Sequence, residues 1–178
     1  EELKFRFRLD KIGKIVPGGE TGQMSIYNGL KAAEEVYGVD DNIVLIHDGV
    51  RPLINEQIIT DNIECVKKNG AAITSAPAKE TFVLIDDEGR VADIPSRDHS
   101  RIAKAPQSFY LKDILEAQEW AIGNGNTSMI DSCTLMSAYG KKLALIDGPT
   151  ENIKITTPDD FYMFRAIYDA RENQQLEE

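Results

Sequence analysis

The sequence predicts an α/β fold in which helices cover both faces of a sheet and a β-hairpin arm projects from it. Short β-branched runs alternate along the chain with stretches of helical periodicity, which is typical of this class. The run Ile43–Ile46 is bounded by polar residues, as expected of a buried strand. Two apolar runs, residues 81–85 and 90–94, flank the turn Asp86-Asp87-Glu88-Gly89, which is a hairpin signature. We therefore expect an arm over about residues 79–95.

Helices are expected where apolar residues recur at intervals of three and four. Gly38 and Gly140 are placed to end two of them, and Ser25 is placed to cap the first. Pro158 suits the first turn of the last helix. The expected helices cover residues 24–37, 55–68, 108–122, 131–139 and 158–172.

The remaining strands are shorter and less regular. Residues 5–9 alternate in the manner of a strand, and Ile15 and Val16 resemble a strand end. Further strands are expected at residues 71–76 and 142–146. The polar tail, residues 172–178, is expected to fray.

Composition limits the classes of protein that fit. A chain of 178 residues suits a single domain, here residues 1–178. Its net charge of -10 argues against nucleic-acid binding, which requires a basic face, but a cleft can still attract an anion. No apolar run approaches the ~20 residues that span a bilayer. Cys65 and Cys133 lack metal-ligand spacing and are expected to be reduced thiols of a cytoplasmic protein.

Two segments that follow apolar runs offer groups for a phosphorylated ligand. Ile43–Ile46 leads into His47-Asp48-Gly49-Val50-Arg51-Pro52, at the strand end where open α/β sheets bind ligands. There a carboxylate suits Mg²⁺ and an arginine suits phosphate; the alternative is a surface Asp–Arg pair. Gly18 and Gly19, followed by Ser25, form a loop that lets a ligand approach the backbone, although an ordinary turn and helix cap explain them equally well.

Two later segments carry cations in an otherwise acidic chain. Arg97, Arg101 and Lys104 lie within eight residues of one another, which indicates either an anion site or a solvated loop. His99, between them, is more often structural than catalytic. Lys154 has apolar neighbours on both sides and is positioned to neutralise charge on a phosphoryl group, or else is an exposed strand lysine.

Taken in order, these segments resemble the 2-C-methyl-D-erythritol 4-phosphate cytidylyltransferases and their ribitol-5-phosphate cytidylyltransferase relatives. Order and spacing hold from residue 15 to residue 165, so the joint match is far more specific than any single motif. The matching residues are Gly18-Gly19…Ser25, His47-Asp48…Arg51-Pro52, Thr81, Arg97…Pro106-Gln107…Phe109 and Asn152-Ile153-Lys154…Thr156…Pro158…Asp160.

The resemblance implies a Rossmann-like, mostly parallel sheet of the nucleotide-diphospho-sugar transferase type and a homodimer in which the arm crosses the interface. It implies transfer of CMP from CTP to a polyol phosphate, with release of pyrophosphate and a requirement for Mg²⁺. The residues it implicates are Lys154 and Arg51 in catalysis, Gly18, Gly19, Ser25, Asp48 and Gly49 in nucleotide binding, Thr81, Arg97, Arg51 and Glu151 in acceptor binding, and Asp48 in metal binding.

Several positions depart from the family pattern. The family's N-terminal glycine-rich loop, with its arginine and lysine, is not found in this sequence, and we expect a truncated enzyme rather than a degenerate one. Gly22 replaces a usual arginine, and Ala105 and Ile130 replace acceptor-side threonines. We expect methylerythritol phosphate, an isoprenoid precursor, as the acceptor; the alternatives are ribitol 5-phosphate, used in cell-wall or capsule polymers, a non-catalytic nucleotide-binding homologue, or an unrelated Rossmann-like hydrolase or structural module.

Overall fold

The computed structural model describes residues 2–176. Contacts between Cα atoms divide the chain into two compact units. The first unit comprises Glu1–Val44 and Phe109–Leu143, and the second comprises Leu45–Ser108 and Ala144–Glu178. The division falls inside two strands, β1 (Ile43–Ile46) and β5 (Arg101–Tyr110).

The first unit is mainly helical. After the short helix α1 (Glu2–Arg6), it contains α2 (Gly22–Tyr37), α4 (Leu111–Gly123) and α5 (Ser132–Ala138). Helix α4 packs against both α2 and α5, and its apolar face is fully buried. A buried side chain joins these elements: the Gln23 amide donates to Gln118 at 3.1 Å and accepts from the backbone N–H of Met129 at 2.8 Å.

The second unit contains most of the sheet and the arm. Its helices are α3 (Glu56–Asn69) and α6 (Pro158–Leu176), with the 3₁₀ turn η1 (Arg97–His99). Its strands are β2 (Ala71–Pro77), β3 (Leu84–Ile85), β4 (Val91–Asp93) and β6 (Ala144–Asp147). It also contains residues 45–46 of β1 and residues 101–108 of β5.

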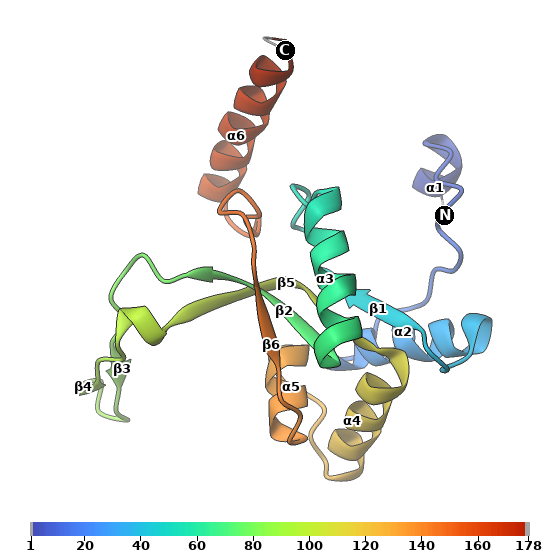
Figure 1. Ribbon diagram of the computed structural model, residues 1–178, viewed down its shortest axis with the longest axis horizontal. Coiled ribbons are helices and arrows are strands. Elements are labelled where there is room, and N and C mark those ends of the chain that lie inside the picture. Colours follow the sequence, from blue (N-terminus) through green and yellow to red (C-terminus); the bar gives the residue numbers. More distant parts are fainter. Residues whose placement is uncertain (1, 177–178) are drawn as a thin grey trace. The chain divides into compact units, whose positions relative to one another are not determined.

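Within the described residues, the main sheet has the strand order β1-β5-β2-β6. Strand β2 pairs in parallel with β6, with Ala72 opposite Ala144 and Ser75 opposite Asp147. Helix α3 packs against both of these strands, which accounts for the complete burial of Ile73 and Val66. Strands β2 and β5 extend together beyond the sheet and lead to the β3–β4 hairpin (Figure 1). The predicted α/β class, with a mostly parallel sheet and a projecting arm, is confirmed.

Side chains cap the helices where the sequence contains Thr, Asn or Asp. Asn55 accepts from the N–H of Ile58 at 2.9 Å and begins α3. Helix α2 begins two residues before the predicted start, because Thr21 rather than Ser25 accepts from the N–H of its third residue. The prediction that Ser25 caps this helix was therefore wrong.

Other differences from the predicted elements have physical causes. Residues 5–9 do not form a strand: they continue from α1 into turns, and none of the strands in the described part of the chain pairs with them. Ile15 and Val16 lie in an irregular segment for the same reason. The strand Ile43–Ile46 has the predicted limits, although its side chains are half-buried rather than buried.

The largest omission from the prediction is β5, because cations and Pro106 interrupt its apolar pattern. The helix expected from residue 108 begins at Leu111, and the hairpin strands are shorter than predicted. Helix α6 continues through the part of the tail expected to fray, up to Leu176; residues 177 and 178 lie outside the described residues. Over residues 2–176, each helix is too short or too polar to cross a membrane.

Candidate functional site

The end of β1 turns sharply through the segment that contains the first site residues. The N–H of Arg51 donates to the carbonyl of Asp48 at 3.0 Å, which closes the turn. The His47 ring braces the same turn, since Nε2 lies 2.9 Å from the Arg51 carbonyl. A carbonyl oxygen only accepts, so Nε2 is the donor in this contact. His47 is thus a structural residue of this turn.

One carboxylate and two cations meet at this turn. The Asp48 Oδ2 atom lies 2.9 Å from Nε of Arg51 and 3.6 Å from Nζ of Lys154. The Arg51 side chain is only 11% exposed, whereas that of Lys154 is 49% exposed. Arg51 is therefore fixed in place, and Lys154 presents its ammonium group to solvent or to a ligand. The two cations leave a net positive charge beside Asp48, in a protein that is acidic as a whole.

Lys154 reaches Asp48 because the residues on both sides of Lys154 in the sequence are bound to the turn. The Arg51 guanidinium donates to the carbonyl of Asn152 at 2.9 Å, and the N–H of Ile155 donates to the carbonyl of Val50 at 2.9 Å. Asn152 is completely buried, and its amide donates to the carbonyl of Ala105 on β5 at 2.7 Å. The bonds from Arg51 to Asn152 and from Ile155 to Val50 join two stretches that lie about a hundred residues apart in the sequence.

A third cation, Lys104, lies behind this segment. Its Nζ is 3.3 Å from each of the carbonyl oxygens of Pro149, Thr150 and Asn152. Burial, and next the nearby charge of Arg51, lower the pKa of Lys104 below its usual value. Sequence reasoning placed Lys104 among clustered cations and gave no role to Asn152. Their partners are backbone carbonyls, which leave no signal in the sequence.

The second unit also contains a cavity of about 510 Å³ beside these residues. Lys104 and Glu151 line it, together with Lys79 and Phe82 of the arm and Met163 of α6. Its wall is mostly apolar, with charged groups from the arm, from β5 and from the segment before Lys154. Of the four residues predicted to bind the acceptor, the structure places Glu151 in this wall.

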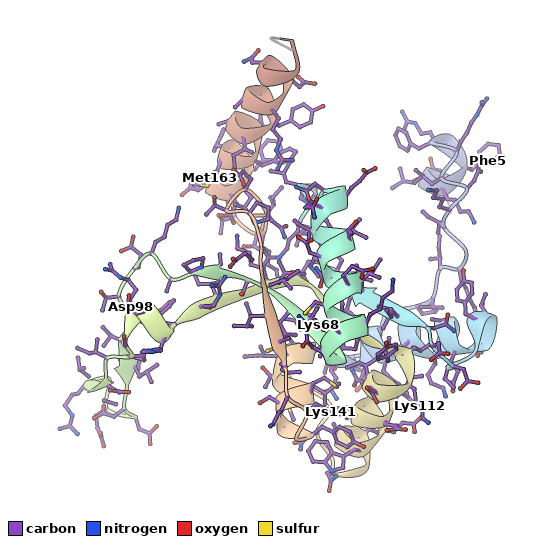
Figure 2. The ribbon with its side chains drawn as sticks, viewed as in Figure 1. Phe5, Lys68, Asp98, Lys112, Lys141 and Met163 are labelled. Atoms are coloured by element: carbon purple, nitrogen blue, oxygen red, sulfur yellow. The ribbon has the colours of Figure 1, made fainter. Side chains whose placement is uncertain are left out.

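Two predicted acceptor residues, Thr81 and Arg97, are exposed on the arm. Among the described residues, neither makes a hydrogen bond or ion pair with Asp48, Arg51 or Lys154. Figure 2 shows the side chain of Asp98, next to Arg97 in η1, well apart from Met163 of α6, which lines the cavity. Within one chain, Thr81 and Arg97 are therefore not bonded to the turn, whereas their arm neighbours Lys79 and Phe82 line the cavity beside it.

The predicted base-binding residues lie in the first unit. The Ser25 hydroxyl accepts from the N–H of Gly19 at 2.9 Å and donates to the carbonyl of Thr21 at 2.9 Å. A Cβ on Gly19 would lie 2.8 Å from the backbone of Met24, so chain packing alone requires glycine there. At Gly49, in the second unit, a Cβ would meet open space. Packing does not explain that glycine.

The segment that follows Lys154 is fixed by the start of α6. The Asp160 carboxylate accepts from the N–H groups of Thr156 and Thr157, at 2.9 and 2.8 Å, and from both hydroxyls. The Thr157 hydroxyl in turn accepts from the N–H of Asp160, which makes a reciprocal cap around Pro158. These bonds, led by the one from the Thr156 N–H, lower the pKa of Asp160 to about 2.

Asp48 is also the residue expected to hold a metal ion. Over the described residues, no group of three or more acidic, cysteine or histidine side chains is arranged to bind a cation. Mg²⁺ is commonly held by one or two carboxylates together with water and substrate phosphates. The half-exposed Asp48 carboxylate fits a site of that kind, which is completed by a phosphorylated ligand.

The fold and the turn together are typical of a class: α/β proteins that bind phosphorylated ligands at a strand end, where a carboxylate and paired cations suit such a ligand. Residues 4–170 match the model of the family described as IspD: 2-C-methyl-D-erythritol 4-phosphate cytidylyltransferase. The chain belongs to this family. It is a CTP-dependent cytidylyltransferase, which is a nucleotidyltransferase, as the sequence resemblance implied.

Relatives of this chain are named for two different cytidylyltransferase reactions. The chain is 59% identical to a ribitol-5-phosphate cytidylyltransferase of Streptococcus agalactiae, covering 96% of this chain and 71% of that protein. It is 37% identical to a 2-C-methyl-D-erythritol 4-phosphate cytidylyltransferase of Clostridium botulinum, covering 91% and 69%.

A solved structure supports the fold. The crystal structure of 4-diphosphocytidyl-2C-methyl-D-erythritol synthase from Anaerococcus prevotii matches with a TM-score of 0.80 and 31% identity. The match covers 94% of this chain and 77% of that one.

Proposed function

We propose that the chain transfers CMP from CTP to ribitol 5-phosphate. The observation that carries the proposal is the 59% identity to a protein named for that reaction, against 37% to one named for methylerythritol phosphate. Ala105 and Ile130, which replace acceptor-side threonines of the methylerythritol enzymes, agree with it. The comparisons thus favour our alternative acceptor and reverse the order of the two expectations from sequence.

In the proposed reaction, a phosphate oxygen of the acceptor attacks the α-phosphorus of CTP. The new O–P bond forms as the bond from that phosphorus to the bridging oxygen breaks, and pyrophosphate leaves with the electron pair. Both reactants are anions, so the protein must mainly position them and neutralise charge. Arg51 and Lys154 are the catalytic cations in this proposal, since they lie together beside Asp48.

Asp48 would hold Mg²⁺ in the proposed enzyme. The ion would supply charge neutralisation on the nucleotide phosphates when bound. The present hydrogen bond of Asp48 to Arg51 keeps the carboxylate oriented at the strand end. The remaining carboxylate oxygen is not needed for that bond and is the one we assign to the metal.

The nucleotide would approach Gly49, where packing leaves room and a side chain would narrow the approach. Gly18, Gly19 and Ser25 are proposed to contact the cytosine ring. The bond from the Gly19 N–H to Ser25 fixes the loop shape, and it is compatible with a base edge bound to neighbouring backbone groups. This role stays a prediction for all three residues.

Thr81, Arg97, Arg51 and Glu151 are proposed to bind the acceptor, with the arm residues acting across a homodimer interface. Exposed apolar side chains support such an interface, because they are costly to leave in water. They lie on the arm, for example Leu84 at 51% exposed, and on α6, for example Tyr162 at 68%. The thiols of Cys65 and Cys133, which form no disulfide within the described residues, agree with our proposal of a reducing cytoplasmic location.

The test is an assay of pyrophosphate release by the full-length protein with CTP, Mg²⁺ and each polyol phosphate in turn. We expect kcat/KM for ribitol 5-phosphate to exceed that for methylerythritol phosphate by at least tenfold. Equal or reversed values would contradict the acceptor assignment. Size-exclusion chromatography with light scattering tests the dimer, and replacement of Leu84 and Ile85 by Ser should shift a dimer toward monomer.

A further inference from the structure

Lys104 is a half-buried cation whose hydrogen bonds end on backbone carbonyls. Its Nζ is 3.3 Å from the carbonyl oxygens of Pro149, Thr150 and Asn152, and within the described residues it forms no ion pair with a carboxylate. Burying an ammonium group costs free energy unless its protons are bound. Three converging carbonyl oxygens meet that need, because an ammonium group has three N–H donors.

This count of donors argues against direct binding of a phosphate by Lys104. With three protons directed at three carbonyls, no proton remains for a phosphate oxygen. Arg51 and Lys154 differ in this respect, since their cationic groups lie at the Asp48 carboxylate. Lys104 is therefore placed to act through the backbone segment that it binds.

The segment it binds leads directly to Lys154. Residues 149–152 cross the second unit beside β5, and Asn152 is held from two sides, by Lys104 and by the Arg51 guanidinium at 2.9 Å. Lys154 follows Asn152 by two residues. The distance between its ammonium group and the Asp48 carboxylate therefore depends on the position of residues 149–152. Loss of the three Lys104 bonds would leave residues 149 and 150 without this tie to β5, and the Asn152 amide, bound to Ala105, would be the remaining side-chain bond to that strand.

We propose that Lys104 is a positioning residue for cytidylyl transfer: it holds residues 149–152 in place so that Lys154 stays beside Asp48. The proposal rests on the proposed role of Lys154 in catalysis. A compact ammonium suits converging acceptors better than a planar guanidinium does. Lys104→Arg keeps the charge and several donors, so it should restore the function in part.

The experiment compares Lys104→Met and Lys104→Arg with the wild type, and uses Lys68→Met on α3 (Figure 2) as the matched control. We expect Lys104→Met to lower kcat about tenfold or more, with the KM for CTP within about twofold, because small misplacements of a reacting group reduce the rate steeply. Lys104→Arg should recover part of kcat, and Lys68→Met should match the wild type.

Hydrogen exchange measured by mass spectrometry provides a readout that needs no acceptor. Peptides covering residues 150–155 should exchange faster in Lys104→Met than in the wild type, because the backbone bonds there, such as Ile155 N–H to Val50, lose support. Unchanged kcat would overturn the proposal. So would unchanged exchange together with a raised KM for the acceptor, which would indicate direct contact with substrate.

Two further controls keep the outcomes distinct. If the wild type releases no pyrophosphate with ribitol 5-phosphate, the proposed acceptor fails, while the exchange comparison still tests the positioning of residues 149–152. Should Lys104→Met fail to fold, as judged by circular dichroism, Lys104→Gln takes its place with the same readouts, since its amide keeps a neutral donor.

Discussion

Two regions of the second unit bear proposed site residues, and they are built in opposite ways. The turn at the end of β1 is held by Arg51, His47 and the segment before Lys154, through bonds of 2.9 Å to backbone groups. The arm is fixed at its base, where Arg101 binds Ser75 and Asp147 and Ala78 binds Ser100. Beyond its base, Thr81 and Arg97 are exposed to solvent.

This difference in construction fits the two functions proposed for these regions, which are transition-state stabilisation and acceptor binding. Stabilising charge in a transition state needs groups that are fixed before the reaction, because their reorganisation would cost rate. Binding an acceptor across an interface needs groups that reach outward from the chain that carries them. The turn meets the first requirement and the arm meets the second. Substitutions in the two regions should therefore affect different kinetic constants.

Arg51→Ala should have the largest effect, because Arg51 is both a proposed catalytic cation and a tie between two segments. We expect kcat to fall by about hundredfold or more. Loss of bonds to Asp48 and to the Asn152 carbonyl should also cost about 1–3 kcal/mol of stability, or roughly 2–12 °C in Tm. Steady-state kinetics and thermal unfolding measure the two effects. A rate like that of the wild type would refute the role.

Lys154→Ala should affect turnover with little change in stability. Its side chain is half-exposed, and its ammonium lies 3.6 Å from Asp48, too far for a strong bond. We expect kcat to fall at least tenfold, while Tm stays within about 2 °C, as for surface substitutions. The measurement is kcat alongside thermal unfolding. An unchanged kcat would remove Lys154 from the catalytic set, and a large fall in Tm would make it structural.

Arg97→Ala should show the other side of the comparison. Arg97 follows the arm, and within the described residues it makes no hydrogen bond or ion pair with Asp48, Arg51 or Lys154. Its loss should therefore leave the turn intact. We expect the KM for the acceptor to rise about tenfold, equivalent to about 1.4 kcal/mol, with the KM for CTP nearly unchanged. Varying each substrate separately measures both constants. A rise in the KM for CTP instead would mean that the arm is misassigned.

Asp160→Asn should have the smallest effect, and that effect should depend on pH. The folded state lowers the pKa of Asp160 from its usual 3.8 to about 2, so its ionised form stabilises the fold. That contribution is complete above about pH 4 and is lost as pH falls toward about 2. The variant should unfold at a slightly lower temperature at pH 7, with the difference shrinking near pH 2. Thermal unfolding across this range checks it, and a difference that grows in acid would contradict it.

Local features of the site were predictable from sequence. Asp48 and Arg51 are three residues apart in one turn, so a pair between them follows from spacing. The strand Ile43–Ile46 was predicted with its observed limits, since polar residues bound it on both sides. The helix expected over residues 55–68 is likewise observed as α3, Glu56–Asn69, within one residue at each end. Such features depend on neighbours along the chain.

The features that sequence reasoning missed depend on distant backbone groups. Lys104 appears in the sequence as one cation among several, because the three carbonyls that bind it carry no residue-specific pattern. Strand β5 was missed because Arg101, Lys104 and Pro106 interrupt its apolar run, although each has a partner or a place in the structure. The misassigned cap at Ser25 arose because Thr21 started α2 earlier.

The bonds that hold the segment before Lys154 end on main-chain oxygens, and this has a consequence for how the segment can vary. Replacing the side chain at position 149 or 150 leaves those acceptors in place, whereas replacing either donor removes a bond outright. A saturation library should therefore tolerate many residues at 149 and 150 and few at 51 and 104. Tolerance to mutation would then follow the direction of each hydrogen bond rather than distance from the reacting phosphates.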